Sequence, residues 1–109
     1  MLVELDVFSG RPNPRWQLTG DEAARLARLL EILEPAKADP STQPPGLGYR
    51  GFRFEDSAGS TWLAYGGFVR SPQAILADPN RSVERLLLEY LPAQYGELQP
   101  SIERELGTA

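Results

Sequence analysis

Apolar and polar residues alternate at the start of the chain, which predicts a β-strand. In the first eight residues, Val3, Leu5 and Val7 alternate with Glu4 and Asp6. A period of two gives a strand one buried face and one polar face. We therefore expect the two carboxylates to project from the same, polar side of this strand.

Two later segments have apolar residues at three- and four-residue spacing, which predicts the main helices. The first follows Thr19, which can form a capping box with Glu22. The second begins at the Asp-Pro pair of residues 78–79, a capping acid with a proline suited to a first helical turn, and Pro92 ends it. A short final helix is expected over residues 100–106.

The middle of the chain predicts a hairpin that follows a long loop. Residues 49–55 and 61–65 alternate on either side of a turn-forming sequence. Residues 71–77 form a short apolar segment that the pattern leaves open between a strand and a helix. Residues 35–48 hold four prolines and two glycines, which is typical of a surface loop.

Together these elements predict a single α+β domain over residues 1–109. We expect a three- to four-stranded, mostly antiparallel sheet with the two main helices packed on one face. The predicted core is Val3, Leu5, Val7, Leu26, Leu30, Phe52, Phe54, Leu63, Val83, Leu87 and Leu91. The other sheet face would carry Glu4, Asp6, Arg53 and Glu55. If the first strand neighbours the hairpin, Arg53 can pair with Asp6 or Glu4.

The stretch from Ser9 to Trp16 is more constrained than a simple connection between a strand and a helix. Pro12 and Pro14 have fixed φ angles and disfavour helical geometry in the residues before them, Arg11 and Asn13. The stretch is therefore expected to form a defined turn that holds its side chains in fixed relative positions.

Two arginines in this turn, Arg11 and Arg15, are open to two interpretations. Arginine is rarely buried without a partner. Either the guanidinium groups pair with Asp6, Glu4 or a nearby carbonyl and hold the turn, or they face an anionic partner. Trp16 either packs in the core or contributes to binding.

Composition narrows the chemistry that this chain can perform. It has no cysteine and no histidine, so thiolate chemistry, zinc–cysteine sites and histidine bases are excluded, and no catalytic motif is present. No cofactor is expected. The richness in Arg, Ala, Leu and Pro resembles that of proteins from GC-rich, bacterial-like genomes.

Charge and hydropathy indicate the kind of partner. A net charge of −4 disfavours nucleic acid. Arg11, Arg15, Arg50, Arg53 and Arg70 can nevertheless converge on this acidic background. No apolar run approaches the ~20 residues that span a bilayer, and the chain starts with a strand in place of a signal peptide. We therefore expect a cytoplasmic protein with no membrane contact.

The favoured hypothesis is a non-enzymatic binding or protein-interaction module centred on the Ser9–Trp16 turn. Arginine and large aromatic residues dominate interface hot spots. A protein partner or a small anionic ligand would fit, and Pro44-Pro45 could dock into an aromatic groove of a partner. The candidate binding residues are Arg11, Asn13, Arg15, Trp16, Arg53 and Tyr65.

Two alternatives remain from other classes of function. A small cofactor-free enzyme would use Asp6 or Glu4 as the acid–base group and Arg11 to stabilise an anion. An oxygen-ligand, calcium-type metal site would use Asp6, Ser9 and Asn13.

Overall fold

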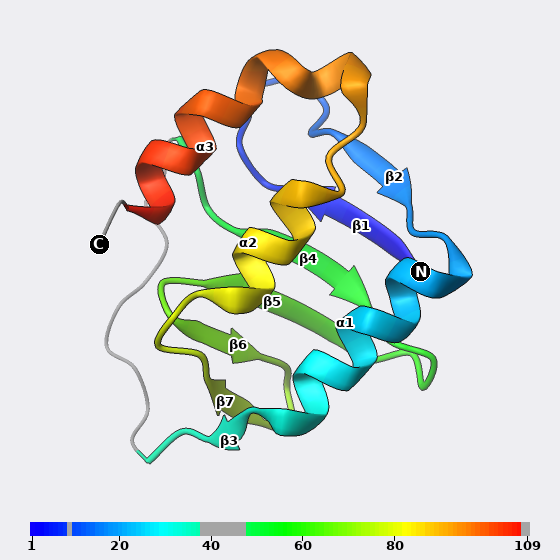
Figure 1. Ribbon diagram of the computed structural model, residues 1–109, viewed down its shortest axis with the longest axis vertical. Coiled ribbons are helices and arrows are strands. Elements are labelled where there is room, and N and C mark those ends of the chain that lie inside the picture. The colour runs from blue at the N-terminus through cyan, green and yellow to red at the C-terminus, as the bar shows by residue number, and fades with distance from the viewer. Residues whose placement is uncertain (9, 38–47, 108–109) are drawn as a thin grey trace.

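Figure 1 shows a computed structural model of the chain, in which residues 1–8, 10–37 and 48–107 are described. Its strands are β1 (Leu2–Leu5), β2 (Arg15–Gln17), β3 (Glu34–Pro35), β4 (Phe52–Glu55), β5 (Thr61–Tyr65), β6 (Phe68–Arg70) and β7 (Ile75–Ala77). Its helices are α1 (Gly20–Ile32), α2 (Ser82–Glu89), the 3₁₀ helix η1 (Ala93–Leu98) and α3 (Gln99–Leu106). The strands form one antiparallel sheet in the order β2-β1-β4-β5-β6-β7-β3.

The α+β class matches the prediction, but the predicted size of the sheet was wrong. The described residues form seven strands and three α-helices, whereas three to four strands and two helices were expected. The extra strands are only two or three residues long, so they contain too few positions for a period of two to show. β3 contains Pro35, which belonged to the predicted loop; proline is tolerated there because β3 is an edge strand. Residues 38–47 of that loop, including Pro44-Pro45, lie outside the described residues.

The sheet has two different faces. α1 and α2 lie on one face, in front of the strands in Figure 1. Register places Leu5, Phe52, Ala64 and Val69 in one row across neighbouring strands, and all four are fully buried on that side. No described helix covers the opposite face in this view.

Most of the predicted core residues are buried or pack against the buried core, and Leu63 is the exception. Val3, Leu5, Leu26, Phe52, Phe54, Val83 and Leu87 are buried, and Val7, Leu30 and Leu91 pack against them. Leu63 pairs in register with Arg53 and Arg70, on the face away from the helices. The strand around Leu63 was predicted correctly, but Leu63 was placed on the helix-facing side of the sheet, which is wrong.

The predicted start of α1 is confirmed, whereas α2 begins later than predicted. The capping box of α1 is formed: the Glu22 N–H donates to the Thr19 hydroxyl at 3.1 Å, and the Thr19 N–H donates to Glu22 Oε1 at 2.9 Å. α2 begins at Ser82, later than the Asp-Pro pair indicated, because Asp78 accepts from the N–H groups of Ser82 and Val83.

Gly51 directly precedes β4 and lies against residues of β5, and its φ is +102°. An added Cβ would overlap the carbonyl oxygen of Ala64 and lie 2.9 Å from Cβ of Tyr65. We expect Gly51→Ala to lower the free energy of unfolding by about 3 kcal/mol or more, from backbone strain and overpacking together. Urea unfolding measures this change.

Gly59→Ala is the matched control, because Gly59 also has a positive φ, +87°, but open space around its Cβ position. It should cost only the conformational strain of about 1–2 kcal/mol. Equal losses in the two variants would contradict a steric role for Gly51.

Candidate functional site

The side chain of Asn13 organises the turn between β1 and β2. Its Oδ1 accepts hydrogen bonds from the backbone N–H groups of Val7 at 3.0 Å and Phe8 at 2.7 Å. Its Nδ2 donates to Glu4 Oε2 at 2.8 Å and to Asp6 Oδ1 at 3.3 Å. The Asn13 side chain therefore bridges the two ends of the turn and holds the carboxylates of Glu4 and Asp6 in place.

Asp6 is buried, only 6% exposed, and two arginines hold its carboxylate. Arg50 donates to Oδ1, with its Nη2 at 2.7 Å, and Arg53 donates to Oδ2 through both Nε and Nη2. Arg50 also donates to the carbonyl oxygen of Phe8 at 2.8 Å. Because a buried charge is tolerated only when it is paired and hydrogen-bonded, this arrangement stabilises the turn against β4.

The two exposed arginines of the turn lie in different surroundings. Arg15 is 63% exposed and pairs with Glu4 at 3.2 Å. The guanidinium carbon of Arg11 lies 3.7 Å from the centroid of the Phe8 ring, in a cation–π contact. No carboxylate of the described residues lies within ion-pair distance of Arg11. Of the two interpretations, Arg15 contributes to holding the turn, whereas Arg11 presents its charge to solvent.

We call this group of side chains the turn cluster; it consists of Glu4, Asp6, Arg11, Asn13, Arg15, Arg50 and Arg53. Four arginines and two carboxylates leave it a surplus of two positive charges, on a chain whose net charge is −4. The positive charge of the protein is therefore locally concentrated, and the cluster suits an anionic group.

Several predicted site residues meet in this cluster, and others lie elsewhere. The structure brings together Glu4, Asp6, Asn13, Arg15 and Arg53, and it confirms the pair between Arg53 and Asp6. Trp16 faces the helices, where it is buried and packs edge-on against Phe52. Tyr65 packs beside Tyr49, with the ring centroids 5.7 Å apart. Ser9 lies outside the described residues.

Arg50 belongs to the turn cluster but was not among the candidate site residues; it was named only as one of five arginines that could converge. Strict alternation would place Arg50 on the same side as Phe52, which faces the helices. The positive φ of Gly51 breaks the alternation, so Arg50 and Arg53 both reach Asp6. Gly51, directly before β4, is the sequence signal that could have indicated such a break.

A second charged cluster joins the start of β4 to α2. Glu84 is only 1% exposed, and it accepts from the hydroxyl of Tyr49 and from a fork of two Arg81 nitrogens at 2.8 and 3.0 Å. Burial raises the pKa of the Tyr49 hydroxyl, and the nearby charge of Glu84 raises it further. The hydrogen bonds to Glu84 raise the pKa of Arg81.

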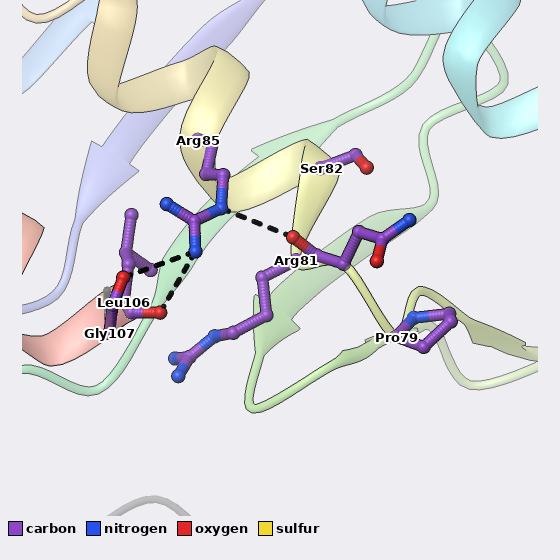
Figure 2. A pocket seen from close by; sticks show the side chains of 7 residues that line it. Pro79, Arg81, Ser82, Arg85, Leu106 and Gly107 are labelled. Atoms are coloured by element: carbon purple, nitrogen blue, oxygen red, sulfur yellow. Dashed lines mark hydrogen bonds between the residues drawn. The ribbon is translucent and has the colours of Figure 1, made fainter. Parts of the chain in front are cut away.

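A pocket of about 470 Å³ opens beside this cluster, between the start of α2 and the end of α3 (Figure 2). Arg85 donates to the carbonyl oxygens of Leu106 and Gly107, and Arg81 donates to that of Glu105. Cations at these positions satisfy the last carbonyls of α3 and oppose the negative end of its dipole. The pocket arginines therefore have a structural explanation, and we take the turn cluster as the candidate site.

The described residues contain neither a cluster of acidic side chains that could hold a metal ion nor a membrane-spanning helix. They contain no group of three or more Asp or Glu side chains placed to hold a metal ion. None of their helices is both long and apolar enough to cross a membrane.

Comparison with known proteins gave no relative from which to transfer a function. The sequence matched no family model, and it matched no curated protein and no solved structure.

Replacing Asp6 should uncouple the turn from β4. Asp6→Asn leaves Arg50 and Arg53 without their anion, so we expect the free energy of unfolding to fall by about 3 kcal/mol. That value is the lower end of the loss usual when one partner of a buried ion pair is removed. Glu4→Gln is the control: its pair with exposed Arg15 should be worth less than about 1 kcal/mol. Urea midpoints that move equally in both variants would contradict the central role of Asp6.

The buried hydroxyl of Tyr49 should make stability depend on alkaline pH. Its raised pKa means that the native state keeps the proton above pH 10, whereas the unfolded chain releases it near the reference pKa of about 10. The native state then binds more protons, so the free energy of unfolding falls by up to about 1.4 kcal/mol per pH unit as pH rises above about 10.

Tyr49→Phe removes this contribution, and Tyr95→Phe provides the control. The Tyr49→Phe protein should show a flatter pH dependence of urea unfolding between about pH 10 and 11.5, whereas the Tyr95→Phe protein should keep the wild-type slope. Identical slopes in the wild type and Tyr49→Phe would show that the hydroxyl is not protected in the native state.

Proposed function

We propose that this protein is a non-enzymatic binding module that recognises an anionic group at the Ser9–Trp16 turn. The observation that carries the proposal is the state of Arg11. Its guanidinium group stacks on Phe8, faces solvent and has no carboxylate partner among the described residues. Stacking orients the planar guanidinium and leaves its N–H donors available to a carboxylate or phosphate.

The rest of the turn cluster supports this proposal by holding the described residues around the turn in place. Asn13, Arg50 and Arg53 hold Asp6 and the backbone around it. A ligand that meets a fixed turn does not have to order it, so little conformational entropy is lost on binding. The surplus of positive charge would also speed the approach of an anion.

The enzyme alternative finds less support in the same contacts. Asp6 receives hydrogen bonds from Arg50, Arg53 and Asn13, so its oxygens are committed within the protein. A general base has to reach a proton on a substrate. Glu4 is similarly engaged by Arg15 and Asn13.

The metal alternative is disfavoured for a related reason. The Asn13 oxygen already accepts from two backbone N–H groups, and both oxygens of Asp6 face guanidinium groups. A calcium ion needs six to eight oxygen ligands and would be repelled by adjacent cations.

We keep the cytoplasm as the proposed compartment, since the chain has no cysteine to form a disulfide.

Arg11→Ala tests the proposal with citrate, a small carboxylate ligand, as the probe. NMR titration should show the Arg11 Nε–H resonance of the wild type shifting on citrate addition. The variant should bind about tenfold more weakly, because a charge-assisted hydrogen bond is worth about 1.5 kcal/mol. Its free energy of unfolding should change by no more than about 1 kcal/mol, the value of an exposed cation–π contact.

Arg28→Ala is the matched control, since Arg28 is an exposed arginine on α1. It removes the same charge from the helical side and should leave citrate binding unchanged. Equal citrate affinity in the wild type and Arg11→Ala would refute the proposed function. A loss of stability well above 1 kcal/mol would assign Arg11 to holding the turn.

A further inference from the structure

Three arginines fall into one row across the sheet face that no described helix covers. Glu4 pairs in register with Arg15 on β2 and with Arg53 on β4. Leu63 on β5 pairs with Arg53 and, on its other side, with Arg70 on β6. The complete row, from the β2 edge inward, is Arg15, Glu4, Arg53, Leu63, Arg70 and Ile75.

The arginines in this row are regularly spaced. Neighbouring strands lie about 4.8 Å apart, so the arginines, on every second strand, are about 9.6 Å apart and span roughly 19 Å. Arg15 and Arg53 are exposed, but Arg15 pairs with Glu4 at 3.2 Å and Arg53 pairs with Asp6 at 3.0 Å, so each offers a partner only the N–H donors that these pairs leave free. Arg70 is partly exposed. Within the described part of the chain, no carboxylate lies in ion-pair distance of Arg70. The row is too long for a small anion to contact more than part of it.

Apolar surface accompanies the charges. Leu2 is 44% exposed, and a shallow pocket of about 140 Å³ lies beside the row, lined by Leu2, Glu4, Arg53, Phe54, Glu55 and Thr61. Leu63 lies in the row itself. A partner that contacts this face would therefore meet both guanidinium groups and aliphatic side chains, as is common at protein interfaces.

We propose that this row binds an extended acidic segment of a protein partner that runs across the strands, with an acidic residue at every third position. The proposal rests on the proposed function and names the partner of that surface. A polyproline II helix has three residues per turn and rises about 3.1 Å per residue, so every third side chain recurs on one side at about 9.3 Å. That repeat matches the roughly 9.6 Å between the arginines, and long arginine side chains absorb the small difference and the sheet twist.

Charge complementarity selects a peptide over a nucleic acid. Glu4 lies between two of the arginines, and Glu55 lies beside the row. A continuous phosphate backbone would meet these carboxylates, whereas a peptide with acids at every third position can place neutral residues there. The whole chain also carries a net charge of −4, which opposes a polyanion.

The test compares two fluorescein-labelled peptides of equal composition by anisotropy at low salt. One is Glu-Pro-Pro-Glu-Pro-Pro-Glu, with the predicted spacing, and the other is Glu-Glu-Glu-Pro-Pro-Pro-Pro. We expect the spaced peptide to bind about fivefold more tightly, the gain from one further ion contact of about 1 kcal/mol.

Arg70→Ala should abolish that preference, because Arg70 marks the far end of the row. Arg70→Gln, which keeps more of the side-chain packing, should do the same, and Arg28→Ala should not. Arg53 is not used because its contact with Asp6 holds the turn. Unfolding curves of the two Arg70 variants that match the wild type would show that the lost preference is not a folding defect.

Equal affinity for the two peptides, or a preference that survives both Arg70 substitutions, would overturn this inference. So would tighter binding of an oligothymidylate through Arg70, which would make nucleic acid the occupant.

The citrate result at Arg11 separates the two proposals. If citrate binding depends on Arg11 but the peptides do not differ, the anion site stands and the row is wrong. If the preference for the spaced peptide depends on Arg70 but citrate affinity does not depend on Arg11, the proposed anion site at the turn is wrong.

Discussion

The buried carboxylate of Asp6 is the interaction on which the rest of the site depends. It lies just beyond β1, and its partners come from the turn and from the segment that enters β4, more than forty residues later. These contacts join parts of the chain that the sheet alone would pair only through backbone hydrogen bonds. An unpaired charge at this position would be costly, so the geometry of the turn and the position of β4 are specified together.

Asp6 also determines which arginines remain available. Arg50 and Arg53 pair with Asp6, and Arg15 pairs with Glu4. In the described part of the chain, Arg11 and Arg70 have no carboxylate within ion-pair distance. The contacts that hold the turn and the charge that faces solvent therefore come from different residues of the turn cluster. The helices contribute from the other face of the sheet, where the buried apolar row fixes the strands.

The sequence predicted those features that depend on local patterns. The α1 capping box, the β4–β5 hairpin and the polar face that carries Glu4 and Asp6 all follow from spacing within a few residues. Features that depend on distant partners were missed or misplaced. β3 exists because β7 supplies its partner, and Leu63 faces outward because the helices cover the other side. Arg50 joined the site through the backbone of Gly51, whose conformation no hydrophobic pattern encodes.

Short edge strands have a consequence for how this sheet behaves in a concentrated solution. An open sheet has two borders whose backbone groups can recruit another chain and start aggregation. Here the borders are β2, with three residues, and β3, with two. Arg15 and Gln17 are exposed on the first border, and Pro35 offers no N–H on the second. Neither border offers a long, flat, apolar ladder, so the sheet can leave one face without a described helix while its edges discourage fibre-like growth.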